Sequence, residues 1–133
     1  CIIPVGFISM LIEPEIENQL VYGIGWQFSN YKLLPLVFLS CMVTGYTEEI
    51  FFRSYLFKSL QNAGAGLLPA AIITSLLFGA GHIYEGYYAF AATAAIGAFL
   101  SFIFIKTKSI HTVAIGHGLY NFSVLLIAMT GVL

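Results

Sequence analysis

Residues 33–60 read LLPLVFLSCMVTGYTEEIFFRSYLFKSL, an apolar run interrupted by two adjacent glutamates and one arginine. At about 1.5 Å per residue, a helix of this length exceeds the hydrocarbon core of a bilayer, which is about 30 Å thick. The run therefore predicts a membrane-spanning helix that carries Glu48, Glu49 and Arg53 within it. Ionisable side chains at such depth are rare unless they face the protein interior. We expect these three residues to belong to a buried polar site.

The composition supports the same class of protein. Of 133 residues, 59% are hydrophobic and only 8% are charged, whereas a soluble domain carries about 25% charged residues. The net charge is −1 and there is no basic cluster, so we expect no nucleic-acid partner. Cys1 and Cys41 are not spaced as a metal-ligand pair, and Cys41 is expected to be a small core residue.

Three further apolar runs predict three further spans, at residues 67–83, 87–105 and 110–133. The run at 87–105 is rich in small residues, mainly alanine, which favours close packing of helices in lipid. The expected fold is an all-α, polytopic transmembrane helix bundle with a four-helix core over residues 33–133. Short loops make neighbouring spans antiparallel, and the lysines at 58, 106 and 108 then mark the cytosolic side.

Residues 1–32 differ from the rest of the chain. Cys1–Ile12 is apolar but too short to span a membrane, and a polar stretch with three glutamates and then several aromatic residues follow it. We expect a truncated N-terminal apolar helix followed by an interfacial segment. Residues 1–133 are expected to form a single membrane-embedded domain that is the C-terminal part of a longer protein.

The residue types present limit the chemistry. The chain contains no aspartate, so neither an aspartate dyad nor a Ser-His-Asp triad is possible. The sequence also lacks the HExxH zinc-protease motif and the GxSxG nucleophile elbow. Any catalysis must therefore use glutamate, histidine, asparagine and arginine.

Helical spacing suggests how these side chains are arranged. Glu49 and Arg53 are four residues apart and share a helix face, so they are expected to form an ion pair. Glu48 points about 100° away from Glu49 and can face another group. A structural alternative is that both glutamates and Arg53 form an ion-paired brace. His117 and Asn121 are also four residues apart, in the last span.

His82 lies near the end of the second span, after the small residues at positions 79–81. Because the first two spans run in opposite directions, simple depth counting puts His82 nearer the outer face than Glu48. A short or tilted second span, or a deeper start of the first span, would relieve this mismatch.

Together these residues resemble the CAAX protease and bacteriocin-processing family, also called CPBP or Abi, of intramembrane endopeptidases. The resemblance rests on Glu48-Glu49-x-x-x-Arg53, Phe78-x-x-x-His82 and His117-x-x-x-Asn121, which occur in the family's order in separate apolar segments. It implies a multi-pass protein of a bacterial or archaeal cytoplasmic membrane. The implied substrate is a peptide or protein in contact with membrane lipid, with prenylated proteins as one class.

The resemblance also implies residue roles. Glu48 would be the general base, His82 would help to hold the water, and His117 with Asn121 would stabilise the oxyanion. Glu49 and Arg53 would form the structural ion pair. A divalent metal such as zinc, held by Glu48, His82 and His117, would make the enzyme a metalloprotease; we favour a glutamate-type peptidase without a metal. The functional alternatives are a non-catalytic immunity or scaffold protein of the same fold and a proton-coupled transporter fragment.

Overall fold

The computed structural model describes residues 31–129, and every regular element in that range is a helix. The described part starts with one long helix composed of a 3-10 turn η1 (Tyr31–Leu33), α3 (Leu34–Glu49), a π-helical segment η2 (Ile50–Phe57) and α4 (Lys58–Asn62). It continues through α5 (Leu67–Ala80), a 3-10 turn η3 (Ile83–Glu85), α6 (Tyr87–Thr107) and α7 (Ile110–Met129). The predicted all-α transmembrane bundle is confirmed, whereas the predicted N-terminal helix and almost all of the interfacial segment lie outside the described residues.

Three of the described helices are long and apolar enough to cross a membrane, namely Tyr31–Asn62, Tyr87–Thr107 and Ile110–Ile127. The predicted second span, residues 67–83, is shorter than expected. Helix α5 has 14 residues and ends at Ala80, so it is about 21 Å long and does not match a core of about 30 Å. Its end coincides with two glycines, which are poor helix formers, and His82 has already left the helical conformation with φ −115° and ψ 7°.

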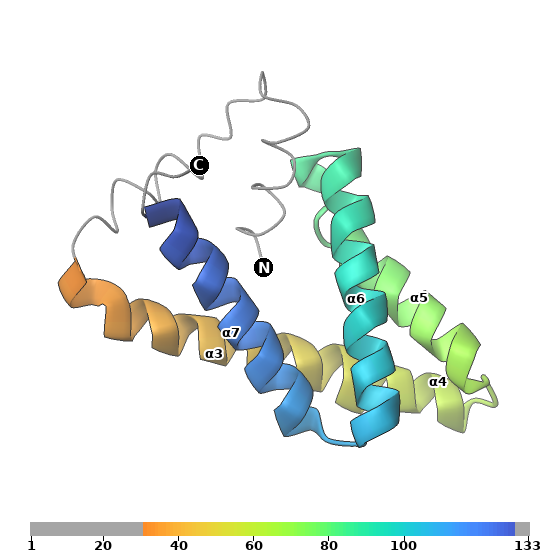
Figure 1. Ribbon diagram of the computed structural model, residues 1–133. Helices are drawn as coiled ribbons and strands as arrows, with labels where there is room; N and C mark the ends of the chain where they lie inside the picture. Colours follow the sequence, from red (N-terminus) through yellow and green to blue (C-terminus); the bar gives the residue numbers. More distant parts are fainter. Residues whose placement is uncertain (1–30, 130–133) are drawn as a thin grey trace.

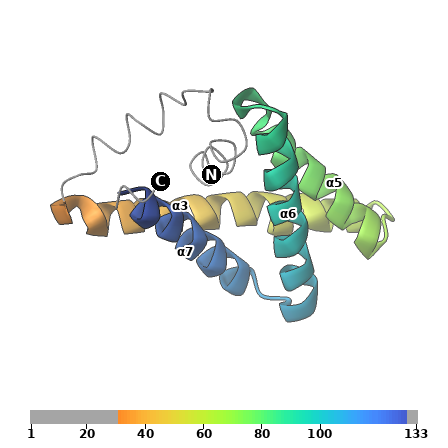
Figure 2. The ribbon, with the colours of Figure 1, turned by 45° about the horizontal axis from the view of Figure 1, so that its top comes forward.

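The bundle is built from two helix pairs joined by the π-helical segment. Helix α7 packs along α3, helix α6 packs along α5, and η2 contacts both α5 and α7. Figure 1 and the turned view in Figure 2 show the long helix along one side of the bundle, with the pairs meeting at its middle. The middle of the long helix is therefore the place where residues from every part of the described chain can meet.

Two glycines allow these pairs to pack at backbone contact. A Cβ atom added to Gly45 in α3 would lie 2.8 Å from the carbonyl oxygen of Ala114 in α7, and one added to Gly79 in α5 would lie 2.7 Å from that of Phe90 in α6. Real side chains do not tolerate such distances, so both crossings require a residue without a Cβ. The close packing expected of the small residues is thus present in the structure.

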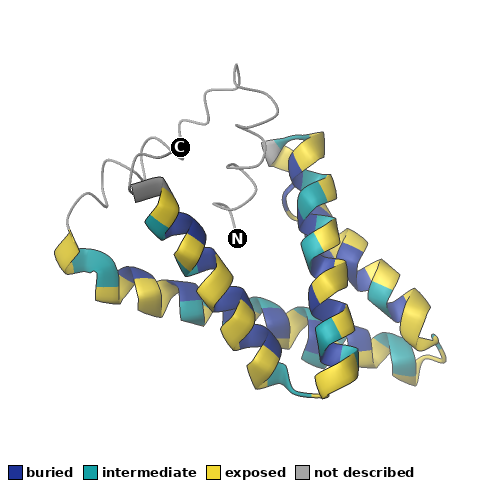
Figure 3. Cartoon of the chain, viewed as in Figure 1, coloured by how far each residue is buried: buried dark blue, intermediate teal, exposed yellow. Residues whose placement is uncertain are grey.

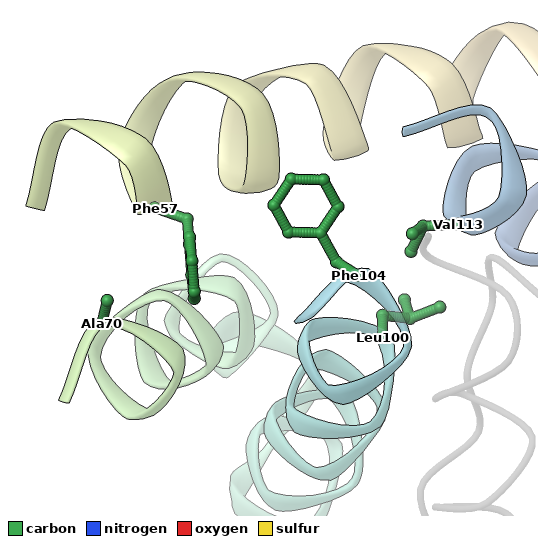
Figure 4. Close-up of a cluster of buried hydrophobic side chains, with 5 residues drawn as sticks. All are labelled: Phe57, Ala70, Leu100, Phe104 and Val113. Atoms are coloured by element: carbon green, nitrogen blue, oxygen red, sulfur yellow. The ribbon is translucent and has the colours of Figure 1, made fainter. Parts of the chain in front are cut away.

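Buried apolar side chains fill the space between η2, α5, α6 and α7. One cluster takes a residue or two from each of η2, α5, α6 and α7 (Figure 4), and its members are Phe57, Ala70, Leu100, Phe104 and Val113. A second cluster joins α3 to α7 through Val37, Cys41 and Leu125. Cys41 is therefore a buried core residue, as predicted.

The outer faces of the helices are apolar too. Figure 3 shows buried residues along the inner faces and exposed residues along the outer faces. Large apolar side chains are exposed on every long helix, including Leu39, Val43, Phe51, Phe99 and Phe102. Such a surface is unusual in water and is the expected one for helices solvated by lipid.

Candidate active site

The two adjacent glutamates at the end of α3 differ in burial. The side chain of Glu49 is completely buried, whereas that of Glu48 remains 23% exposed. Successive residues of a helix point about 100° apart, which explains why one carboxylate faces the packed interior and the other does not. Glu48 is consequently the carboxylate that a water molecule or a substrate can reach.

Glu49 is the centre of a buried polar chain. Its Oε1 accepts a hydrogen bond of 2.9 Å from Nη1 of Arg53 and lies 2.8 Å from Nδ1 of His117. Arg53 also donates from Nη2 to the carbonyl oxygen of Gly97, 2.8 Å away. These hydrogen-bonded side chains therefore connect η2 to α6 through Arg53 and to α7 through His117. The expected ion pair of Glu49 and Arg53 is part of this larger network.

His117 is held between the two carboxylates. The crossing of α3 and α7 at Gly45 brings the backbone of Gly118 into contact with α3, and His117 precedes Gly118. Since a carboxylate can only accept, the short contact to Glu49 assigns a proton to Nδ1 of His117. The other ring nitrogen, Nε2, then faces Oε2 of Glu48 at 3.7 Å. His117 is itself only 1% exposed, so this arrangement lies inside the bundle.

His82 approaches the same region from the turn after α5. Its ring centroid lies 5.9 Å from that of Phe78, and the Phe78 ring lies 5.8 Å from that of His117. Both histidine rings therefore pack against the same aromatic ring. Phe78, in the last turn of α5, packs against Phe52 of η2 with ring centroids 5.0 Å apart, which brings the end of α5 close to the glutamates. The separation of His82 from Glu48 expected from depth counting is therefore not present in the structure.

Asn121 and His111 occupy the same helix as His117. Asn121 is 5% exposed and lies one turn beyond His117 on the buried face of α7. His111, at the start of α7, is exposed, and its Nδ1 lies 3.1 Å from the hydroxyl of Tyr46. The structure thus places Asn121 beside the buried network and His111 outside it.

An apolar cavity of about 230 Å³ lies between α6 and α7 and extends to His117. Its walls are mainly the aliphatic and aromatic side chains of the two helices, and Gly116, one residue before His117, forms part of its lining. A Cβ atom added to Gly116 would meet no other atom within 4 Å. The cavity is therefore an open, hydrophobic space next to His117.

A comparison with protein families assigns the chain to a known family. The family model described as type II CAAX prenyl endopeptidase Rce1-like matches residues 30–123, which include all three motifs. The chain belongs to this family. No curated protein and no solved structure matches the chain. Rce1-like membership and the apolar helices make this an integral membrane protein of a peptidase family.

A metal ion in the Rce1-like site would need several ligating side chains close together. In residues 31–129, no group of three or more histidine, cysteine, aspartate or glutamate side chains lies close enough together to hold one. Nδ1 of His117 is engaged with Glu49, and Glu49 is in turn engaged with Arg53. The candidate set of Glu48, His82 and His117 therefore does not form a ligand cluster in the described part of the chain.

Sequence reasoning missed three parts of this site. The contact between Glu49 and His117 joins residues 68 positions apart, and no local spacing predicts it. The carbonyl of Gly97 as acceptor for Arg53 was not foreseen, although the small residues of the third span indicated close packing there. The Phe78-x-x-x-His82 pattern contains Phe78 but does not indicate that its ring contacts both histidines.

Proposed function

We propose that this Rce1-like protein is an intramembrane endopeptidase in which Glu48 activates the hydrolytic water. The observation that carries this proposal is the pairing of a partly exposed carboxylate with a buried imidazole, Glu48 Oε2 to His117 Nε2 at 3.7 Å. That separation is too long for a direct hydrogen bond. It suits two groups that act on different atoms of a water molecule and a substrate carbonyl.

The two ring nitrogens of His117 face different groups. Nδ1 lies 2.8 Å from Oε1 of Glu49, and Nε2 lies 3.7 Å from Oε2 of Glu48. When Nε2 carries a proton, it is the kind of donor that an oxyanion requires.

The proposed reaction uses side chains of this chain at each step. Glu48 takes a proton from water as the new bond forms between the water oxygen and the peptide carbonyl carbon. His117 and Asn121 donate hydrogen bonds to the oxyanion, and His82 helps to hold the water. When the C–N bond breaks, protonated Glu48 returns the proton to the leaving amine, which restores the carboxylate.

A cleavage screen with the purified protein tests this function. A prenylated CAAX peptide and a set of leader peptides would be incubated with the protein, with and without a metal chelator. We expect cleavage of at least one peptide at the same rate in both conditions, because no proposed step uses a metal. Cleavage that disappears with the chelator and returns with added zinc would contradict the metal-free mechanism, and no cleavage of any peptide would contradict the function.

The cavity between α6 and α7 suggests where an apolar substituent of the substrate binds. The family's description refers to prenyl endopeptidases, and a prenyl group is a hydrocarbon chain that an apolar cavity next to His117 can accommodate. We propose that the prenyl group of the substrate occupies the cavity between α6 and α7 while the substrate's peptide lies over Glu48. Burial of a hydrocarbon chain is worth about 0.8 kcal/mol for each CH₂ group, enough to contribute strongly to substrate affinity.

Filling the cavity tests this placement. Because the space beside Gly116 is open, Gly116→Phe should occupy it and raise KM at least about tenfold for a long-chain prenyl peptide, with little change for a short-chain analogue. Ala98→Phe is the matched control, since Ala98 lines a different apolar groove between α5 and α6. An equal rise in KM for both variants, or none for Gly116→Phe, would rule out this binding mode.

A further inference from the structure

The buried ring of Phe78 contacts two histidines of the candidate site. It lies in α5, is 2% exposed, and meets the rings of both His82 and His117 in edge-type contacts at 5.9 and 5.8 Å. The two imidazoles come from different elements, the turn after α5 and helix α7. Both imidazoles therefore pack against this one ring, and Glu49 also holds His117 through Nδ1.

The ring of Phe78 is fixed on its other sides as well. Phe52 of η2 packs against it at 5.0 Å and 86°, and the guanidinium carbon of Arg53 lies 5.2 Å from its centroid. From α6, a Cβ atom on Gly97 would come within 3.1 Å of the Phe78 Cδ1 atom. Close-packed neighbours of this kind leave a ring little freedom to tilt or shift.

We propose that Phe78 is a positioning residue, whose ring sets the distance and angle between the imidazoles of His82 and His117. This inference rests on the proposed peptidase function, in which both imidazoles must act on the same water and carbonyl as Glu48. Phe78 itself touches no reacting atom. Its effect is geometric, and displacement of a reacting group by about 1 Å can reduce a rate by about 100-fold.

Phe104 provides a matched comparison. It is also a buried phenylalanine, 6% exposed, and it packs edge-on against Phe57 at 5.8 Å and 88°. It belongs to the apolar cluster that also contains Phe57, Ala70, Leu100 and Val113. Substituting leucine at either position removes a buried ring with one or more aromatic partners, but only Phe78 has the two histidines among its partners in the described part of the chain.

The kinetic test compares Phe78→Leu with Phe104→Leu, with Phe78→Met as a second variant because methionine fills core space without a ring. We expect both Phe78 variants to lose about 100-fold in kcat with KM unchanged, and Phe104→Leu to keep its kcat at a similar loss of thermal stability. In a His82→Ala background, Phe78→Leu should cost much less than it does alone. Equal losses at both phenylalanines, or multiplicative losses with His82→Ala, would overturn the proposal.

A spectroscopic measurement tests the contacts of Phe78 with the two imidazoles without a substrate. The chain has three histidines, and His111 contacts Tyr46 rather than Phe78. In NMR spectra of histidine-labelled protein, both Phe78 variants should shift the imidazole signals of His82 and His117 and leave that of His111 in place. Unchanged signals would overturn the proposal. Because no cleavage is needed, this result separates a failure of the Phe78 inference from a failure of the peptidase function.

Discussion

Glu48→Gln is expected to reduce peptide cleavage by about 10²–10⁴-fold, the usual contribution of a general base. The amide has nearly the shape of the carboxylate but cannot accept the proton of water. Because Glu48 is 23% exposed and lies outside the fully buried pair of Glu49 and Arg53, we expect stability to change by less than about 1 kcal/mol. Cleavage rates and thermal unfolding of the same detergent-solubilised sample measure both effects.

The neighbouring Thr47→Ala variant is the control for Glu48→Gln. Thr47 is exposed on the same helix, and its hydroxyl bonds only locally, to the carbonyl oxygen of Val43. It should therefore cleave like the wild type. If Glu48→Gln also cleaves like the wild type, the assignment of Glu48 as base is wrong.

Arg53→Met is expected to have the largest effect on stability. It leaves the carboxylate of Glu49 buried without its guanidinium, and removing one partner of a buried ion pair typically costs about 3–5 kcal/mol. The hydrogen bond to the carbonyl of Gly97, which connects the long helix to α6, is lost as well. Thermal unfolding in detergent should show a large drop, whereas Lys58→Met, at an exposed lysine of the same long helix, should show almost none.

A double variant identifies the cause of that loss. Glu49→Gln together with Arg53→Met removes both charges, so it should be more stable than Arg53→Met alone, although His117 loses its charged partner. If the double variant is instead destabilised by the sum of the two single effects, the interaction between Glu49 and Arg53 is not what stabilises the junction of the helices.

Much of the fold could be predicted from the sequence because bilayer physics leaves few choices. Apolar runs bounded by polar or glycine-rich breaks predicted each of the four described helices, since a backbone in lipid must satisfy its own hydrogen bonds. The end of α5 was predicted less well. Hydropathy continues through Ile83, but hydropathy does not report where a glycine-rich segment leaves the helical conformation.

The site could be predicted only as far as local spacing allows. Glu49 and Arg53 share a helix face, and so do His117 and Asn121, because residues four apart always do. The contact of Glu49 with His117 depends instead on the crossing of α3 and α7 at Gly45, a tertiary feature that no single motif contains. The π-helical segment after Glu49 was equally unpredicted; such segments often occur at functional sites.

The sequence predicts different roles for the two glutamates. Helical spacing points them about 100° apart, and the family resemblance implies Glu48 as the base and Glu49 as the partner of Arg53. The structure adds the imidazole that lies between them. The buried Glu49 orients His117 through Nδ1, and the partly exposed Glu48 faces Nε2 of the same ring. A single imidazole therefore links the carboxylate that supports the fold to the one proposed to act on water.

The most direct test of that arrangement is a double-mutant cycle of kcat/KM with Glu48→Gln and His117→Ala. Residues that act as one unit show strongly non-additive losses. If Glu48 and His117 act on one hydrolytic water and its carbonyl, the double variant should be about as slow as the slower single variant. Losses that multiply in the double variant would mean that the two side chains work independently, and would contradict the proposed site.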